Sequence, residues 1–263
     1  MDDGFPELHR GNRRSFFQTS GAALGAAGFA SLSSVSDCSA AGLWSSNGHA
    51  RIARNDTLLF QGDSITDAGR NRQKAPRPND QSTLGSGYAW VAAVEVLVSR
   101  RNDGLRIYNR GISGDKVFQL ANRWQADCLD LKPNLLSILI GVNDFWHTFK
   151  HNYQGTAETY ERDYRVLLKR TLKALPRIKL VICEPFVLRC GVVDEKWFPA
   201  FDAYRASAER VAKAYDATFI PFQSIFDEAV KYAPAAQWLQ DGVHPTPDGA
   251  SLMAHNWLKA VDG

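Results

Sequence analysis

The sequence is short of cysteine, of excess charge and of long apolar runs. Its 31 basic and 28 acidic residues leave a formal net charge of only +3 in 263 residues. Proteins that bind nucleic acid usually carry a concentrated basic face, so this balance gives no reason to expect a nucleic-acid partner. Beyond residue 40, no stretch approaches the roughly 20 consecutive apolar residues that span a bilayer. Because 44% of the residues are hydrophobic, the chain can bury one sizeable core.

The four cysteines are too few and too scattered to form a framework. Cys128, Cys183 and Cys190 follow the first forty residues, and none belongs to a Cys-x-x-Cys pair. Three cysteines without paired spacing exclude a disulfide scaffold and a structural zinc site. Cys183 lies in an apolar run and is expected in the core, while a Cys183–Cys190 bridge stays open. Cys38 could carry a lipid anchor, but Asp37 is a poor residue to precede a lipidated cysteine, so this alternative is the less favoured one.

The first forty residues are similar to an export signal. Residues 12–18, Asn-Arg-Arg-Ser-Phe-Phe-Gln, form a twin-arginine pattern, and a weakly apolar stretch rich in Ala and Gly follows it. We therefore expect a Tat-type signal over residues 1–40, a linker over 41–55 and a folded domain over 56–263. The protein is then exported to the periplasm or beyond. The alternative is a disordered cytosolic tail with a chance Arg-Arg pair.

Apolar runs alternate with helical patterns from residue 56 onward. Five runs predict strands at Thr57–Gln61, Arg106–Asn109, Leu135–Ile140, Lys179–Cys183 and Thr218–Pro221. Amphipathic stretches predict helices near Tyr88–Arg101, Lys116–Leu129, Ala157–Ala174, Ala200–Tyr215, Gln223–Tyr232 and Pro247–Ala260. This alternation is typical of a parallel sheet with helices on both faces. The sequence shows no internal repeat and no second domain.

Three connections after strands are expected to carry a site, because loops at strand ends do so in this architecture. Thr66–Gly87 holds several basic side chains, whereas Gly141–Gly155 and Pro185–Pro199 are rich in aromatics. The aromatic residues of the last two are Phe145, Trp146, Phe149, Tyr153, Trp197 and Phe198. They either form a platform for sugar rings or pack on neighbouring loops or at a subunit contact.

Four short blocks carry the chemistry. They are residues 62–64 (Gly-Asp-Ser), 109–115 (Asn-Arg-Gly-Ile-Ser-Gly-Asp), 141–144 (Gly-Val-Asn-Asp) and 241–245 (Asp-Gly-Val-His-Pro). Gly62 allows a sharp turn after the first strand, so that Ser64 can point into a cleft above the sheet. Asp241 and His244 supply the base and its orienting carboxylate, which a serine nucleophile needs.

In this order the blocks resemble the GDSL, or SGNH, hydrolase family over about residues 56–260. A lone Gly-Asp-Ser is weak evidence, but four blocks in order at strand ends are specific. The Gly-x-Ser-x-Gly elbow of α/β-hydrolases is absent around Ser64. The resemblance implies an α/β fold, namely a three-layer α/β/α sandwich. Its flavodoxin-like parallel sheet is expected to have five strands in the order 2-1-3-4-5.

The resemblance also implies roles for five residues. Ser64 matches the nucleophile, His244 the general base and Asp241 the carboxylate that orients it. The backbone N–H groups of Ser64 and Gly114 and the side-chain amide of Asn143 match the oxyanion donors. Losing one such donor typically lowers turnover ~100- to 1,000-fold. The resemblance implies no metal and no cofactor.

Plainer interpretations exist for each position. Ser64 can cap a helix, Asn143 can close a turn and Gly114 can be an ordinary turn glycine. Asp67 and Asp144 are interpreted as structural carboxylates that accept backbone N–H groups and hold loops in shape, not as metal ligands. Asp63 has the same interpretation and is also, with Trp146 and Trp197, a candidate substrate contact.

Within the family, the chain resembles bacterial carbohydrate acetylesterases, especially xylan acetylesterases, over residues 62–70, 109–115 and 140–146. The resemblance implies removal of O-acetyl groups from a sugar or polysaccharide through an acetyl-Ser64 intermediate. It also implies assembly into a homo-oligomer. One alternative is a lysophospholipase or acyl-thioesterase, which needs an apolar groove beside Ser64. Another is a carbohydrate-binding module on an inactive hydrolase fold.

Overall fold

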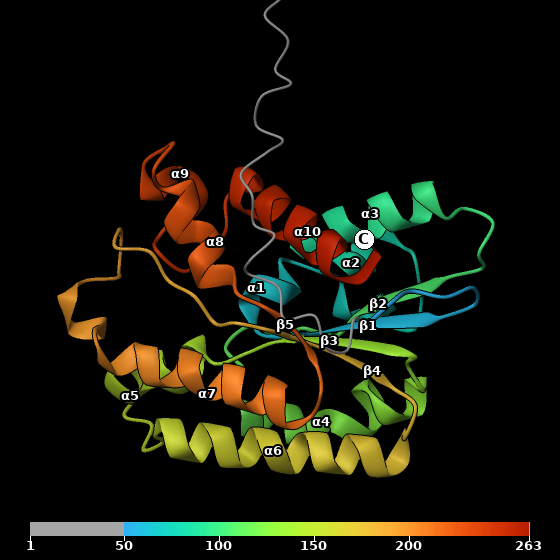
Figure 1. Ribbon diagram of the computed structural model, residues 1–263, viewed down its shortest axis with the longest axis horizontal. Helices are drawn as coiled ribbons and strands as arrows, with labels where there is room; N and C mark the ends of the chain where they lie inside the picture. The colour runs from blue at the N-terminus through green and yellow to red at the C-terminus, as the bar shows by residue number, and fades with distance from the viewer. Residues whose placement is uncertain (1–49, 263) are drawn as a thin grey trace, which may run out of the picture. The chain divides into compact units, whose positions relative to one another are not determined.

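A computed structural model describes residues 50–262, which fold around one parallel sheet (Figure 1). The strands lie in the order β2-β1-β3-β4-β5. They are β1 (Thr57–Gly62), β2 (Arg106–Asn109), β3 (Leu135–Leu139), β4 (Lys179–Cys183) and β5 (Thr218–Ile220). Gly62 pairs with Leu139, which pairs with Cys183, so the strands end together at one edge of the sheet. The predicted fold class and strand order are confirmed.

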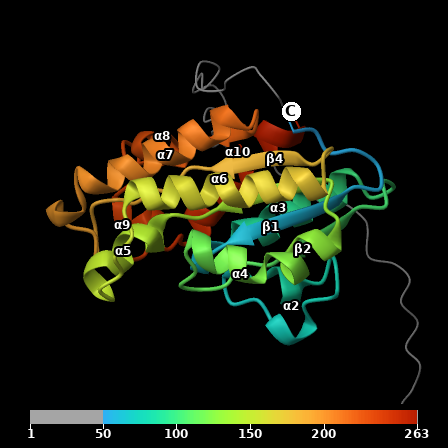
Figure 2. The ribbon, with the colours of Figure 1, turned by 90° about the horizontal axis from the view of Figure 1, so that it is seen from below.

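Helices cover both faces of the sheet, as Figures 1 and 2 show from two directions. One face carries α3 (Tyr88–Ser99), α8 (Phe222–Ala229) and α10 (Pro247–Asp262). The other carries α4 (Val117–Asp127), α5 (Val142–Lys150), α6 (Ala157–Ala174) and α7 (Ala200–Ala214). Short helices interrupt the connections: α1 (Ser64–Asp67), α2 (Gln81–Leu84), α9 (Ala235–Trp238), and the 3-10 turns Arg72–Lys74, Leu129–Leu131 and Glu195–Trp197.

The helix α5 corrects one expectation from the sequence, because it lies inside the segment Gly141–Gly155 that was predicted as a connection. Its Val142 and Phe145 are buried, and Phe145 packs on Phe201 and Tyr204 of α7. These buried residues stand three positions apart, which is a helical spacing. The helix places the start of the Gly141–Gly155 segment firmly against the core.

The core contains the sheet and large aromatic side chains on both of its faces. Strand β1 is buried over its whole length, as expected for a parallel strand covered on two sides. The indole N–H of Trp257 donates to Ser137 Oγ (2.9 Å), and that of Trp124 donates to Thr171 Oγ1 (2.8 Å). Both indoles therefore combine apolar burial with a satisfied donor.

The predicted export signal and most of the predicted linker lie outside the described residues. The last linker residues pack on the domain, since the N–H of Ala50 donates to Thr218 Oγ1 (2.8 Å). The N–H of Ile52 donates to the carbonyl of Val261 (3.3 Å). None of the helices within residues 50–262 combines the length and the apolar character needed to cross a membrane.

Three cysteines lie in the described part of the chain, and all of them are free thiols. Cys183 is buried in β4, where its sulfur lies 3.6 Å from Ser137 Oγ. Cys190 is half-buried, and its thiol donates to the carbonyl of Leu239 (3.4 Å). The Cys183–Cys190 bridge that the sequence left open is therefore absent from this structure.

Candidate active site

Ser64 occupies the sharp turn between β1 and α1. The turn depends on Gly62, because a Cβ there would overlap the carbonyl oxygen of Leu139 on the neighbouring strand. Asp63 caps α1 by accepting the N–H of Ile65 (3.0 Å). Ser64 thus begins the helix without capping it, which leaves its hydroxyl free for another partner.

That partner is His244, from the far end of the chain. Ser64 Oγ lies 2.8 Å from Nε2 of His244. The other ring nitrogen, Nδ1, lies 2.8 Å from Oδ2 of Asp241. The carboxylate can only accept, so Nδ1 carries the proton and Nε2 is left as an acceptor for the serine hydroxyl. The three groups form one chain of hydrogen bonds from a carboxylate to a nucleophile.

Asp241 is fixed by its own loop. Its Oδ1 accepts the backbone N–H groups of Val243 (3.0 Å) and His244 (2.8 Å). Burial would raise the pKa of Asp241, but these two bonds and the His244 ring outweigh it and hold the pKa below the usual value. Asp241 therefore remains ionised and can stabilise a protonated imidazole.

A second loop holds the Asp241–His244 segment from behind. The N–H of Leu188 donates to the carbonyl of Gly242 (2.9 Å), and the N–H of Val192 donates to that of Asp241 (2.9 Å). We call residues 188–193 the bracket loop. It belongs to the connection Pro185–Pro199, which was expected to carry part of a site, and here it positions the base.

Gly114 and Asn143 lie on neighbouring segments at the same edge of the sheet. Gly114 has φ +86°, and nothing stands within 4 Å of the position of a Cβ, so its backbone faces open space. Within residues 50–262, no protein acceptor takes its N–H. The amide of Asn143, in the first turn of α5, donates to the carbonyl of Asp115 (3.2 Å). Since an amide nitrogen carries two hydrogens, one donor stays available.

Two buried carboxylates hold the segment that contains Gly114. Asp67 Oδ2 accepts both the N–H (3.0 Å) and the hydroxyl (2.8 Å) of Ser113. Burial alone would raise the pKa of Asp67, but the guanidinium of Arg72 and the Ser113 donors have the larger effect. The pKa of Asp67 is therefore below its usual value. On the other side, Asp144 Oδ1 accepts the N–H of Val117 (3.2 Å). Both carboxylates accept backbone N–H groups, as the sequence indicated.

Burial acts strongly on the carboxyl groups next to Ser64 and Asn143. Asp63 is 1% exposed and Asp144 is 2% exposed, and burial raises the pKa of each to about 7. In the described chain, Oδ2 of each residue lacks a hydrogen-bond partner. At such depth Asp63 offers no surface to a substrate, so its observed role is to cap α1.

Arg123 of α4 is a site component that the motif analysis missed. Its guanidinium donates to the carbonyl of Arg110 (2.7 Å) and to Oδ2 of Asp115 (2.8 Å), and more weakly to the carbonyl of Gly62 (3.4 Å). One side chain thus connects the ends of β1 and β2 with the Gly114 segment. Nothing in the local sequence distinguishes Arg123 from other helical arginines.

The aromatic candidates separate into two classes. Trp146 is half-buried, 6.4 Å from the His244 ring between centroids, and Lys150 Nζ lies 4.2 Å from the centre of its indole ring. Trp197 is only 1% exposed and packs among Phe145, Phe149 and other rings. Trp146 can therefore touch a bound ligand, whereas Trp197 supports the wall behind it. For Trp197 the packing alternative describes what is observed.

Comparisons with known proteins identify relatives of the chain. Residues 60–252 match the model of the GDSL-like lipase/acylhydrolase family. A curated acetylxylan esterase from Geobacillus stearothermophilus is 30% identical over 215 residues, which cover 80% of this chain and 96% of that protein.

Solved structures agree with this result. A putative GDSL-like lipase from Parabacteroides merdae is 50% identical, with a TM-score of 0.78, over 80% of this chain and 97% of the other. The acetylxylan esterase Axe2 from Geobacillus stearothermophilus is 29% identical, with a TM-score of 0.72, over 80% of this chain and 95% of the other. Structures of Axe2 include catalytic mutants of a serine, an aspartate and a histidine.

Proposed function

Because the chain belongs to the GDSL-like lipase/acylhydrolase family, we propose that it removes O-acetyl groups from acetylated carbohydrate of the acetylxylan type. The chain is a serine carboxylic-ester hydrolase. One observation carries the reaction: Ser64, His244 and Asp241 form a continuous chain of hydrogen bonds. The substrate class is supported by the relative that is itself an acetylxylan esterase.

The acylation half of the reaction follows from this geometry. His244 Nε2 takes the Ser64 proton as Oγ attacks the acetyl carbonyl carbon, and Asp241 stabilises the imidazolium that forms. The negative charge on the carbonyl oxygen is met by the N–H groups of Ser64 and Gly114 and by the free amide hydrogen of Asn143. The C–O bond to the sugar then breaks, and His244 returns the proton to the departing sugar hydroxyl.

Deacylation repeats the same steps with water. His244 removes a proton from water, the hydroxide attacks the acetyl-Ser64 ester, and the same donors stabilise the second tetrahedral intermediate. Acetate leaves as Ser64 recovers its proton. All these groups belong to the chain itself, so no cofactor enters the scheme.

The buried carboxylates have a supporting role in this scheme. Asp67 and Asp144 accept the N–H groups of Ser113 and Val117, which restrains the segment that contains Gly114. Donors that are already in place lose no energy in reorienting when charge develops. The N-terminal twin-arginine pattern supports placing the enzyme outside the cytoplasm, where polysaccharide is found.

The proposed function is tested by acyl-chain selectivity. Turnover of the purified protein is measured on p-nitrophenyl acetate, butyrate and octanoate, and acetate release is measured on acetylated xylan. Activity that falls steeply beyond acetate, together with acetate release from xylan, supports the proposal. Activity that holds or rises toward octanoate contradicts it and favours a lysophospholipase or thioesterase. Inactivity toward all four substrates also contradicts it.

A further inference from the structure

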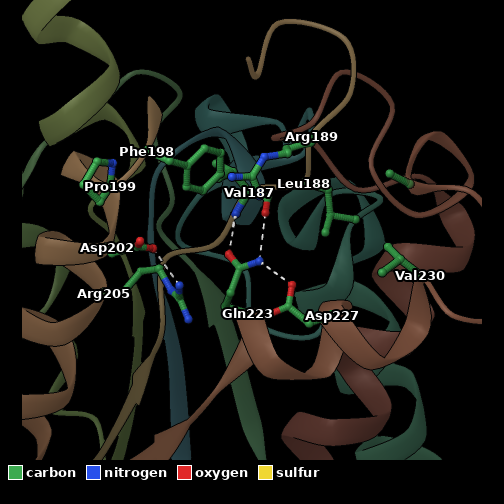
Figure 3. A pocket seen from close by; sticks show the side chains of 11 residues that line it. Val187, Leu188, Arg189, Phe198, Pro199, Asp202, Arg205, Gln223, Asp227 and Val230 are labelled. Carbon is green, nitrogen blue, oxygen red and sulfur yellow. Dashed lines mark hydrogen bonds and ion pairs between the residues drawn. The ribbon is translucent and has the colours of Figure 1, made fainter. Parts of the chain in front are cut away.

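A hollow of about 660 Å³ is lined by none of the catalytic residues. It opens between α7 and α8, and Figure 3 shows its lining side chains. One wall is the bracket loop, whose Leu188 faces the hollow while its N–H holds Gly242. The bracket loop therefore contacts both the hollow and the segment that carries the base. Ligand pockets typically measure about 300–1,000 Å³, so its size suits a small ligand or a section of a chain.

The polar side chains of the hollow are held in place by each other. Gln223 is buried, accepts the N–H of Val187 (3.0 Å), and donates to the carbonyl of Val187 and to Oδ1 of Asp227 (2.9 Å each). On the opposite wall, Arg205 donates to Oδ1 of Asp202 (2.8 Å). Figure 3 shows these bonds on either side of the opening. Their geometry is set before any ligand arrives, which lowers the cost of binding.

Unused donors and acceptors remain on these same side chains. In the part of the chain that the structure describes, no protein group hydrogen-bonds to Oδ2 of Asp202, Oδ2 of Asp227 or Nη2 of Arg205. The Nη1 of Arg189 is unused as well, since Nε and Nη2 bind Glu195. The charged side chains that line the hollow are two arginines and two aspartates, so it presents both donors and acceptors. Such a surface suits neutral hydroxyl groups, which donate and accept at once.

Apolar surface accompanies these polar groups. The guanidinium carbon of Arg189 lies 3.9 Å from the centre of the Phe198 ring. Further apolar surface in the lining comes from Val187, Leu188, Pro199, Val230 and Ala235. A sugar ring has the matching chemistry, because its C–H faces pack on apolar side chains while its hydroxyls reach the rim.

We propose that this hollow binds sugar units of the polysaccharide at a distance from the ester that is cleaved. The inference rests on the proposed function, since the ligand is the backbone of the same substrate. A second contact on one chain raises the effective concentration of the acetyl group at Ser64. This second contact strengthens binding of the polymer, whereas a small ester such as p-nitrophenyl acetate is too short to reach it.

Substitution of two lining residues tests this division between polymer and small ester. Asp202→Ala and Asp227→Ala are combined and compared with a matched double control, Glu209→Ala with Glu228→Ala, at exposed positions outside the hollow. The hollow variant is expected to raise the KM for acetylated xylan about 10-fold, because it loses hydrogen bonds to the ligand. Its kcat/KM for p-nitrophenyl acetate stays at the wild-type value, and the control changes neither.

A binding measurement separates this inference from the proposed function. Full-chain Ser64→Ala protein is titrated calorimetrically with unacetylated xylohexaose, with and without the two hollow substitutions. Weaker binding of xylohexaose by the hollow variant supports the site, whatever the result of the acetate-release assay. Absence of acetate release from xylan by the wild-type protein would contradict the proposed function but not this binding site. Absent binding, or equal binding and equal KM in all variants, overturns the site. A change in KM or in binding also overturns the site if size-exclusion chromatography traces that change to an altered oligomeric state.

Discussion

The hydroxyl of Ser64 and the imidazole of His244 meet at 2.8 Å, although 180 residues separate them in the chain. Ser64 is placed by the end of a central strand, whereas His244 is placed by a loop that precedes the last helix. The distance between them therefore depends on the packing of the whole domain. The pair of His244 and Asp241 depends on only four residues of local backbone.

Replacing Ser64 by Ala is expected to abolish turnover without unfolding the protein. The substitution removes the nucleophile, which in a serine hydrolase lowers kcat by a factor on the order of 10⁶. The hydroxyl is not needed as a helix cap, because Asp63 caps α1. Turnover on p-nitrophenyl acetate and thermal unfolding are measured together, with Ser251→Ala on the exposed face of α10 as the control. Near-wild-type turnover in folded Ser64→Ala protein would falsify the mechanism.

Asp241→Asn tests the orientation of the base. The amide oxygen can still accept the N–H groups of Val243 and His244, so the loop is expected to keep its shape. The amide nitrogen cannot accept from Nδ1, and the imidazole then favours the wrong tautomer. We expect kcat to fall about 10⁴-fold. A loss below tenfold in single-turnover assays would show that Asp241 does not orient the base.

Asn143→Ala is expected to lower kcat about 100- to 1,000-fold while KM changes little, because an oxyanion donor acts mainly in the transition state. Steady-state kinetics on p-nitrophenyl acetate measure the two constants, and Asn102→Ala on an exposed turn is the control. The bond from Asn143 to the carbonyl of Asp115 is also lost, so circular dichroism must first establish that the variant folds. A rise in KM with unchanged kcat would assign Asn143 to substrate binding instead.

Asp144→Asn is expected to change how stability depends on pH. Burial raises the pKa of Asp144 to about 7, whereas an unfolded chain releases this proton near pH 4. Between these values the folded state binds the extra proton, so its free energy of unfolding falls as pH rises toward 7. The amide of Asn keeps an acceptor for Val117 and does not titrate.

The stability of the variant relative to wild type should therefore increase from pH 5 to pH 7.5. Urea unfolding at both pH values measures this difference, and Asp130→Asn at an exposed position is the control. An identical difference at the two pH values would mean that Asp144 ionises as freely as a carboxyl group in water.

Lys116→Met is expected to raise the pKa of His147. Burial first and the neighbouring Lys116 ammonium second lower this pKa to about 4, and Nζ lies 3.0 Å from Nδ1. Removing the ammonium should recover part of the shift, because the burial remains. NMR titration of the imidazole signals measures the pKa, and Lys169→Met on the exposed face of α6 is the control. An unchanged value would contradict a direct effect of the charge.

Much of the fold could be predicted because buried parallel strands are nearly continuous apolar runs. Leu135–Leu139 was predicted to within one residue, and β1 ends at Gly62, one residue beyond the prediction. Helix α5 escaped because its aromatic residues indicated a binding loop. Its Val142, Phe145 and Phe149 stand at positions i, i+3 and i+7, a signal that could have identified the helix.

The site was only partly predictable for a different reason. Motif order singled out Ser64, Asp241 and His244, and the structure brings them into hydrogen-bond contact. The sequence does not reveal which aromatic side chains are buried, so Trp197 and Trp146 were treated alike. Only Trp146 lies near the His244 ring with part of its surface exposed. The contacts of Arg123 depend on how α4 packs, which no local pattern encodes.

The bracket loop has a consequence for how this enzyme could change. It holds Asp241 and Gly242 through main-chain atoms, so an exposed side chain such as Val192 can vary without loss of these bonds, whereas Gly191 cannot, because a Cβ there would meet the backbone of Asp241. Because Asp241 and His244 lie on one short loop, a displacement of that support would shift the imidazole and its carboxylate together. The alignment of base and nucleophile can therefore be adjusted from outside, by a segment that takes no part in the chemistry.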